Sequence, residues 1–305
     1  ISYKQAMLEY GTDKPDLRNP LKIIDLSEFF NRCNFAPFRN KTVRAVKIHG
    51  HQSKGFHEKM LKFATELGMG GLGYLEVQED LSYKGPIDKF IPDELKAELR
   101  ELAGLEKGDT IFFIADKEAR AASFAGQIRT ELGKRLDICE KKAYRFCFIN
   151  DFPMYERDEE TGEIGFTHNP FSMPQGGLDV LLNKNPLEIL AYQYDIVCNG
   201  VELSSGAVRN HNLDVMVKAF EIAGYDEDVL KQKFGALYNA FRFGAPPHAG
   251  MAPGVDRMIM LLRNEENIRE IIAFPMSGTA QDLMCGAPNE VTEQQLREVH
   301  IKVRA

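Results

Sequence analysis

Two acidic residues, Asp195 and Glu202, flank a predicted tight turn at Asn199-Gly200. Asn-Gly between apolar runs is a strong signal for a two-residue β-hairpin turn, and it would pair Val197 with Glu202. Side chains alternate between the faces of a strand, so both acids are expected on one face, together with Val197 and Ser204. Such carboxylates repel, and a Mg²⁺ ion, which prefers oxygen ligands and bridges phosphates, would stabilise them. Two solvated acids at a sheet edge explain the pattern equally well.

Arg209 lies further along the second strand of this hairpin. Strict alternation places it on the face opposite Glu202, but the run Ser204-Ser205-Gly206 lies between them, and glycine in a strand often marks a β-bulge. One extra residue there would return Arg209 to the carboxylate face, and we predict that bulge. A guanidinium on this face could hold a substrate carboxylate with two hydrogen bonds. The alternative is an ordinary salt bridge.

The segment GMAPGVDR, residues 250–257, is the sharpest local signal in the chain. A helix is expected to begin near Gly254, and the free N–H groups of a helix start favour an anion. Arg257 would lie in the first turn and point toward the same anion. We favour an anion site over a glycine-rich helix start whose arginine is merely solvated.

Other motifs are less specific. Residues 68–73 read GMGGLG, but a helix precedes and a strand follows, which is the reverse of the order that a dinucleotide-binding loop needs. No GxxxxGK[ST] phosphate loop occurs in the sequence. His49, His51 and His57 have no further ligands at metal-binding spacing, so we expect solvated loop histidines. His168, in FTHNPF, is by itself a structural or solvated residue.

The elements that position these residues follow from the pattern of apolar residues. A helix over residues 2–10 and a proline-containing connector precede an α+β module, residues 21–137, of strands and amphipathic helices. From Tyr144 onward, strands are followed by helices without βαβ alternation, which favours an antiparallel sheet flanked by helices. We also predict helices over 214–224 and 226–243, and a short strand at IREIIAFP, residues 268–275. The fold class is therefore α+β.

Composition limits the function classes. The 305 residues contain 38 Lys and Arg against 45 Asp and Glu, a net charge of −7, which disfavours non-specific coating of nucleic acid. Five cysteines without a CxxC pair argue against a disulfide scaffold or zinc module and are typical of a cytoplasmic protein. No run of apolar residues reaches membrane-spanning length, and no signal peptide is visible.

Several segments together resemble aspartyl-tRNA synthetases of the bacterial type, a class II synthetase family. These segments are YGTDKPDLR, DFPMYE, FTHNPFSMP, YDIVCNGVELSSGAVR, FGAPPHAGMAPGVDR and NIREIIAFPMSGTAQDLM. They span nearly the whole chain in the family's order, and GMAPGVDR resembles class II motif 3, although the family often has another residue at Pro253. The resemblance implies a connector over residues 1–20, an inserted GAD-type domain over 21–137 and the C-terminal part of the catalytic core over 143–305.

The resemblance also implies roles for individual residues. Asp195 and Glu202 correspond to the acids that bind Mg²⁺, with Glu202 also at the ATP. Arg209 and His168 correspond to residues that bind the aspartate substrate. The stretch Gly254, Val255, Asp256 and Arg257 corresponds to the ATP contact of motif 3. The implied activity is an aspartate–tRNA ligase, which joins aspartate to ATP as an adenylate and then to the 3′ end of tRNA, with no protein nucleophile.

The departures from the family pattern set further expectations. Class II motifs 1 and 2 and an anticodon-binding domain are not found, so we expect a fragment that is inactive alone, from a homodimeric cytoplasmic parent enzyme. The implied partners are aspartate, ATP and tRNA-Asp, with tRNA-Asn left open, and no membrane. A non-catalytic RNA-binding or accessory protein derived from a synthetase body is the alternative. A neighbouring specificity, for asparagine or lysine, is disfavoured because Arg209 suits an acidic side chain.

Overall fold

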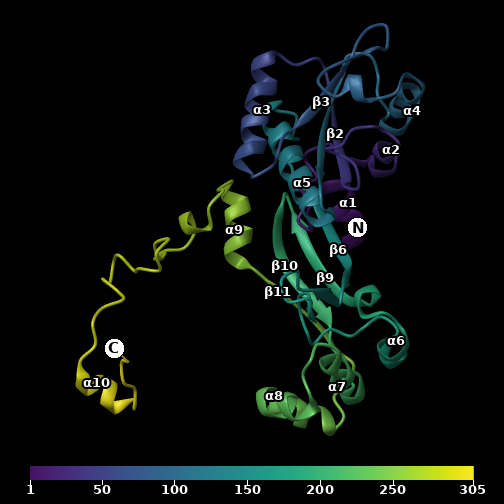
Figure 1. Ribbon diagram of the computed structural model, residues 1–305. Coiled ribbons are helices and arrows are strands. Elements are labelled where there is room, and N and C mark those ends of the chain that lie inside the picture. The colour runs from purple at the N-terminus through teal and green to yellow at the C-terminus, as the bar shows by residue number, and fades with distance from the viewer. Residues whose placement is uncertain (305) are drawn as a thin grey trace. The chain divides into compact units, whose positions relative to one another are not determined.

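A five-stranded antiparallel sheet forms the centre of the module predicted for residues 21–137 (Figure 1). Its strands, in the order β1-β2-β5-β3-β4, are β1 (Ile23–Asp25), β2 (Thr42–His49), β3 (Gly73–Val77), β4 (Tyr83–Lys84) and β5 (Asp109–Asp116). The computed structural model describes residues 1–304 of the chain. Contacts divide the chain into two units, Ile1–Ala252 and Pro253–Ala305, and this sheet belongs to the first.

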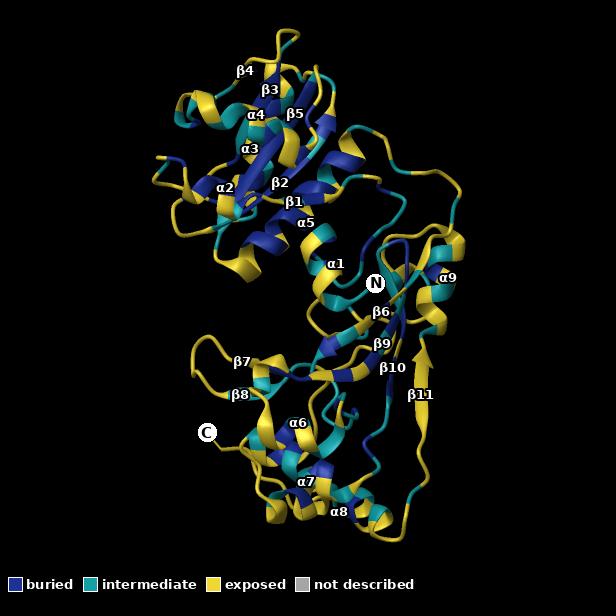
Figure 2. Cartoon of the chain, turned by 90° about the vertical axis from the view of Figure 1, so that its right-hand side faces the viewer, coloured by how far each residue is buried: buried dark blue, intermediate teal, exposed yellow. Residues whose placement is uncertain are grey.

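Helices cover both faces of this sheet, which explains why its central strands β2, β3 and β5 are largely buried. The helices are α2 (Ser27–Asn31), α3 (Lys54–Glu66), α4 (Asp93–Ala103) and α5 (Glu118–Arg135), with the short 3₁₀ helix η1 (Asp88–Phe90). One core joins α2 and α4 to β5 through Phe113, and the other joins α3 and α5 to β5 through Phe112. The strands between them are largely buried, dark blue in Figure 2.

A second antiparallel sheet, with strand order β11-β10-β9-β6, carries the predicted acids. Its strands are β6 (Phe146–Pro153), β9 (Leu190–Cys198), β10 (Val201–Val208) and β11 (Ala249–Pro253). The N-terminal helix α1 (Tyr3–Tyr10) packs Ala6 against Ile149, Phe152 and Val197 of this sheet. Gly11 ends α1 in the left-handed conformation, with φ 69°, as a C-capping glycine does.

Smaller elements complete the first unit. These are the two-stranded sheet of β7 (Tyr155–Arg157) and β8 (Ile164–Phe166), the helices α6 (Gly177–Asn183), α7 (Leu213–Ile222) and α8 (Glu227–Arg242), and the 3₁₀ helix η2 (Pro186–Glu188). The predicted helices over 214–224 and 226–243 are thus confirmed, with a break in α8 at Phe234. Two antiparallel sheets with packed helices confirm the α+β class.

The second unit contains α9 (Val255–Arg263), the 3₁₀ helix η3 (Ile268–Glu270) and α10 (Glu293–Glu298). The strand predicted at residues 268–275 was wrong, because this segment forms η3 followed by bends. The apolar run is too short to distinguish a strand from a helical turn by its composition. The residues directly before α9 form the exposed edge strand β11, which was not predicted from the sequence.

The predicted hairpin is confirmed, and its bulge lies slightly earlier than expected. Val197 pairs with Glu202 as predicted, but the register then shifts between Glu202 and Ser204. Ser205, not Ser204, is therefore opposite Asp195. The prediction that Ser204 shares the face of the acids was wrong. The bulge comes before Ser204, so from this residue onward each side chain lies on the face opposite to the one that a regular strand would give it.

The histidines of the first module are only partly the solvated residues that we expected. His57 is buried within α3, its Nε2 is 3.0 Å from Glu76 Oε1, and its ring stacks on Tyr74. The solvated reading was wrong for His57 because the helix begins at Lys54, before this histidine. The GMGGLG turn behaves as predicted: Gly68 follows α3 with φ 84°, and β3 begins at Gly73.

The hairpin tip supplies a first testable prediction. Asn199 has φ 53°, and its side chain accepts from the Arg145 N–H and donates to the Ala143 carbonyl, both at 2.9 Å. Asn199→Ala, which loses both hydrogen bonds and is strained at positive φ, should lower the free energy of unfolding by about 2–4 kcal/mol in urea titrations.

Asn199→Gly is the matched control, because glycine tolerates the left-handed conformation but makes no side-chain hydrogen bond. It should cost about 1–2 kcal/mol less than Asn199→Ala. Equal losses in the two variants would show that the backbone conformation at the tip does not constrain the fold.

Candidate active site

A small polar pocket of about 110 Å³ lies on the face of the second sheet that carries the two acids. It brings together three of the predicted residues, His168, Asp195 and Glu202. Its other lining residues come from the connector, β6, β9 and β10: Lys14, Phe152, Gln193 and Ser205. Charged and hydrogen-bonding groups dominate this lining, so the pocket suits a small charged ligand.

The bulge in β10 determines which side chains reach this pocket. Asp195 is 7% exposed and projects from β9, while Glu202 leaves β10 before the register shift. After the shift, Ser205 faces Asp195 and takes the place that Ser204 would have had in a regular strand. Ser204 is buried instead. Because of the bulge, the hydroxyl at the pocket is that of Ser205 and not that of Ser204.

Lys14 supplies the positive charge that two neighbouring acids require. Its Nζ lies 2.7 Å from Asp13 Oδ2 and 3.5 Å from Glu202 Oε2. Sequence reasoning expected a cation between the acids but assigned no role to Lys14, because the segment TDKPD was read only as a connector. The available signal was a lysine between two aspartates in a rigid, proline-containing loop.

The charges of the pocket perturb one another. Burial raises the pKa of Asp195, and the negative charge of Glu202 raises it further, while a hydrogen bond from Ser205 and the charge of Lys14 act in the opposite direction. Partial burial alone would lower the pKa of Lys14, but its hydrogen bond to Asp13 and the charges of Asp13 and Glu202 raise it above the ordinary lysine value. Lys14 is therefore held in its charged form, whereas the other residues of the chain compensate the negative charge of Asp195 only in part.

His168 lies in the bend after β8, exposed to solvent. Its ring meets the Phe152 ring edge-on, with centroids 5.0 Å apart and an interplanar angle of 85°. The contact orients the imidazole at the pocket while leaving its nitrogens accessible. The structure thus places His168 beside the acids, which the sequence alone did not indicate.

Arg209 lines a second cavity, of about 210 Å³. Its backbone N–H donates to the His248 carbonyl at 2.9 Å, and it forms an isolated bridge with Ser172. The other residues of this cavity are mostly apolar: Phe171, Asn210, Leu237, Phe241 and His248. Counting along the strand after the bulge puts Arg209 on the same face of the sheet as Asp195, as predicted. The two side chains nevertheless line different cavities.

The second unit contains the residues of the predicted anion site, at the start of α9. Gly254 is the N-cap, so Val255, Asp256 and Arg257 form the first turn as expected. Val255 and Arg257 are exposed. The carboxylate of Asp256 already lies at the positive end of the helix. An anion there needs the cationic Arg257 as well as the helix N–H groups.

The two acids fit Mg²⁺ only as part of a larger ligand set. Among residues 1–304, no group of three or more His, Cys, Asp or Glu side chains could hold a metal ion. Mg²⁺ commonly binds one or two carboxylates and completes its shell with water and substrate phosphates. The raised pKa of Asp195 is consistent with such a site, because a dication would favour its charged form.

The pKa of Asp195 gives a pH-dependent prediction in metal-free buffer. Since its folded-state pKa lies above the unfolded value, stability is fully present below the unfolded pKa and is lost as pH rises through the folded pKa. Asp195→Asn should therefore increase the free energy of unfolding at pH 7. The gain should disappear below about pH 4, near the ordinary pKa of aspartate.

Asp158→Asn is the control with the opposite sign, because backbone hydrogen bonds from Thr161 and Glu160 lower the pKa of Asp158. Its ionised form favours folding, so Asp158→Asn should lower stability at pH 7 and be neutral in acid. Chemical denaturation at several pH values measures both variants. A loss of stability for Asp195→Asn at pH 7 would mean that residues of the chain already compensate the Asp195 charge.

Two further observations concern the chain as a whole. No helix among residues 1–304 is both long and apolar enough to cross a membrane. The structure of aspartyl tRNA synthetase from Entamoeba histolytica overlaps this chain with a TM-score of 0.36 and 20% identity, covering 80% of this chain and 45% of that one.

Sequence comparison gives a much stronger match. Aspartate–tRNA ligase of Streptomyces coelicolor is 52% identical over 306 residues, which cover 100% of this chain and 52% of that protein. Aspartate–tRNA(Asp/Asn) ligase of Paramagnetospirillum magneticum is 53% identical over 310 residues, covering 99% of this chain and 35% of that protein. This chain spans 52% of the length of several such relatives. The profile of the family described as class II tRNA synthetases (D, K and N) matches residues 1–278, and the chain belongs to this family.

Proposed function

We propose that this chain supplies part of the active site of an aspartate–tRNA ligase, which activates aspartate with ATP and transfers it to tRNA. The observation that carries the proposal is the pocket in which Lys14, His168, Asp195 and Glu202 meet. A dicarboxylate amino acid and a polyphosphate need both cations and metal-binding acids, and this pocket offers the two together. The names of the relatives that are about half identical support the same activity.

The proposed chemistry is positioning and charge neutralisation. The α-carboxylate of aspartate attacks the α-phosphorus of ATP, the bond to the β-phosphate oxygen breaks, and pyrophosphate leaves. The resulting adenylate passes its aspartyl group to the hydroxyl at the tRNA 3′ end, releasing AMP. No side chain forms a covalent bond in either step.

Individual residues are assigned by charge and position. Arg209 and His168 are proposed to bind the aspartate side chain, and Lys14 is placed to attract the same carboxylate. Asp195 and Glu202 would hold Mg²⁺, which when bound neutralises phosphate charge. Glu202 and Asp13 orient the ammonium of Lys14, whose Nζ is 3.5 Å from Glu202 Oε2 and 2.7 Å from Asp13 Oδ2.

Two ATP contacts are proposed, one at Glu202 in the first unit and one at the start of α9 in the second. Gly254 lets a phosphate approach the backbone, and the N–H groups of Val255 and Asp256 lie in the first turn of the helix. Arg257 adds a formal charge there, which offsets that of Asp256. This contact would place the nucleotide against a helix start instead of a glycine-rich loop.

The remaining assignments follow the same proposal. Residues 21–137 would be the inserted GAD-like domain, residues 1–20 the connector and residues 143–305 the C-terminal part of the catalytic core. The tRNA partner would be tRNA-Asp, while relatives whose names carry Asp/Asn leave tRNA-Asn as a second substrate. A homodimeric, cytoplasmic enzyme is the proposed parent.

Binding of a non-hydrolysable aspartyl-adenylate, such as the sulfamoyl analogue, tests the proposed function directly. Isothermal titration of the chain with Mg²⁺ present should detect binding, and Arg209→Ala should weaken it by about 1.5–3 kcal/mol, the contribution of a charged hydrogen-bond donor. Arg242→Ala, at the exposed end of α8, is the matched control and should leave the affinity unchanged.

The asparaginyl analogue provides the specificity arm of this test. It should bind more weakly than the aspartyl analogue, because a neutral amide does not satisfy a site built from cations. Equal affinity for the two would contradict an aspartate site. If neither analogue binds, the non-catalytic alternative, an RNA-binding or accessory protein, gains support instead.

A further inference from the structure

The connector that carries Lys14 is held from both sides by segments distant in sequence. The part of it that carries Lys14 is the loop of residues 11–22, between the end of α1 and the start of β1. On one side lies α5, in the module that contributes no lining residue to the polar pocket. On the other side lie the tip of the β9–β10 hairpin and the irregular segment that leads into β6.

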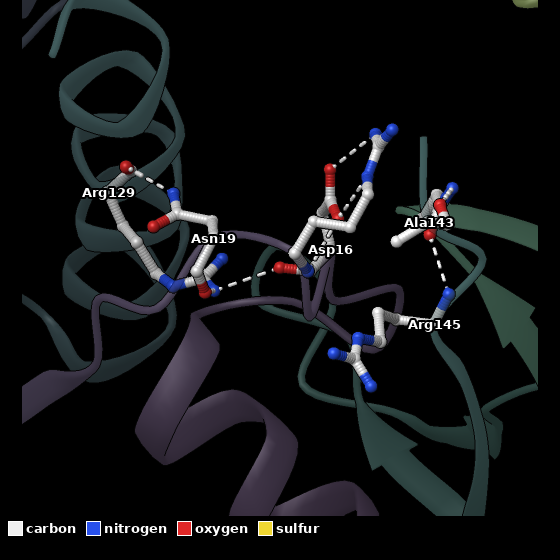
Figure 3. Close-up of polar contacts among 7 residues, drawn as sticks. Asp16, Asn19, Arg129, Ala143 and Arg145 are labelled. Carbon is white, nitrogen blue, oxygen red and sulfur yellow. Dashed lines mark hydrogen bonds and ion pairs between the residues drawn. The ribbon is translucent and has the colours of Figure 1, made fainter. Parts of the chain in front are cut away.

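Arg129 of α5 makes the central contact on the first side. It is 1% exposed, and its guanidinium donates to three backbone carbonyls of the connector: from Nε to Leu21 at 2.6 Å, and from Nη2 to Asn19 at 2.7 Å and to Asp16 at 3.0 Å. Its Cζ also lies 5.0 Å from the centre of the Tyr10 ring. Figure 3 shows the side chain reaching from the helix toward the Asn19 and Asp16 backbone.

The arrangement is unusual for a buried charge, because the ligands of Arg129 in the connector are carbonyl dipoles and not carboxylates. Burial lowers the pKa of Arg129, so desolvation has a cost that these hydrogen bonds must offset. The reverse contact also exists, since Asn19 Nδ2 donates to the Arg129 carbonyl at 2.9 Å. A buried cation that only orders one loop indicates that the conformation of this loop matters.

Small residues allow α5 to approach the connector closely. A Cβ on Gly126 would lie 2.8 Å from the Gly11 carbonyl oxygen, and one on Gly133 would lie 2.3 Å from Asn19 Nδ2. Gly126, Arg129 and Gly133 are spaced by three and four residues, so they share one face of the helix. This face is shaped for the connector, whereas Ile128 and Leu132 pack into the core of the module.

The opposite side of the connector contacts the elements that bear the acids. A Cβ on Gly200, at the hairpin tip, would lie 3.5 Å from Asp16 Cβ, and the Glu140 N–H donates to the Arg18 carbonyl at 3.0 Å. Asn199 ties the same tip to Ala143 and Arg145, the two residues labelled on the right of Figure 3. The connector is therefore in contact with α5 on one side and with the tip of the β9–β10 hairpin on the other.

We infer that Arg129 is a positioning residue for the active site: by fixing the connector, it holds Lys14 at the pocket of Asp195 and Glu202. The inference rests on the proposed function for the ligand that Lys14 meets, but the contacts themselves do not depend on it. The inserted module then takes part in substrate binding without touching the substrate. Its influence passes along the backbone from Asn19 and Asp16, whose carbonyls Arg129 binds, to Lys14.

Arginine is needed for this role because of its geometry. A planar guanidinium presents five N–H donors in a fixed fork, and two of its nitrogens here serve three carbonyls in different directions. A lysine keeps the charge but presents one ammonium group at a single point. Arg129→Lys is therefore expected to behave more like Arg129→Ala than like the wild type.

The first arm of the test is hydrogen exchange, which needs no ligand. The N–H groups of Lys14, Arg18, Asn19 and Leu21 are hydrogen-bonded within the connector, so their exchange reports its order. Arg129→Lys and Gly133→Ala should accelerate their exchange. Gly133→Ala introduces a better helix former, so it displaces Asn19 without weakening α5, and it answers the question even if Arg129→Lys does not fold. Ile128→Ala, a core truncation on the other face of α5, is the control and should leave the connector protected.

The second arm is a double-mutant cycle with Lys14→Met, measured by the affinity for the aspartyl-sulfamoyl adenosine analogue. When Lys14 is present, Arg129→Lys should weaken binding about tenfold. In the Lys14→Met background the same substitution should have almost no effect, because coupled residues are non-additive. Additive losses, or an equal loss for Ile128→Ala, would overturn the positioning role.

The two arms separate this inference from the proposed function. If the wild type does not bind the analogue, the proposed function fails, and the exchange of the connector alone decides whether Arg129 orders it. If the wild type binds and Arg129→Lys binds equally well with an unchanged connector, the positioning role is wrong and the proposed function stands.

Discussion

The repulsion between two carboxylates in one small pocket is the constraint on which the site depends. Asp195 and Glu202 come from adjacent strands of a hairpin, and the pairing of Glu202 with Val197, two residues from Asp195, places both acids on the same face. A β-sheet can place these acids but cannot neutralise them, because its backbone dipoles largely cancel. The compensating charge must come from elsewhere in the chain or from a ligand. Lys14, 3.5 Å from Glu202, provides part of it.

The partial compensation explains why the connector is so firmly held. Lys14 is more than a third exposed at its side chain, so its own ion pairs contribute little to keeping it in place. Order is instead imposed on its backbone by Arg129, by close glycine contacts and by the hairpin tip. Burying the Arg129 guanidinium has a cost in free energy. Arg129 belongs to the module with the larger cores, where Phe112, Phe113 and their neighbours are fully buried and stabilise the fold. A rigid module thus stabilises a loop that binding requires to be fixed.

Much of this could be predicted from the sequence, because the features concerned are local. The Asn199-Gly200 turn, the amphipathic helices and the α9 start at Gly254 each follow from a few consecutive residues. The bulge was predicted from Gly206, but its position depends on which strand residues find partners, so Ser204 and Ser205 exchanged places. His57 and Lys14 could not be placed, since their surroundings come from distant segments: Glu76 and Tyr74 for the histidine, and Glu202 for the lysine. The strand predicted at residues 268–275 was wrong for another reason, because a short apolar run fits a strand and a helical turn equally well.

The location of Arg209 raises the remaining question about the geometry of the site. Strand parity places it with the acids, yet its side chain lines the neighbouring apolar cavity with Phe171 and Phe241. The proposed aspartate site requires a change of rotamer that brings the Arg209 guanidinium toward the acids, and a long side chain has several rotamers available. The carboxylate of a bound amino acid is the natural group to do so.

A crystal structure of the chain bound to the aspartyl-sulfamoyl adenosine analogue and Mg²⁺ tests the account most directly. We predict that the aspartyl side-chain carboxylate lies between Lys14 and Arg209, with the metal on Asp195 and Glu202 and the connector unchanged. An analogue bound with its side chain away from Lys14, or with the metal on other residues, would contradict the central claim that these charges form one site.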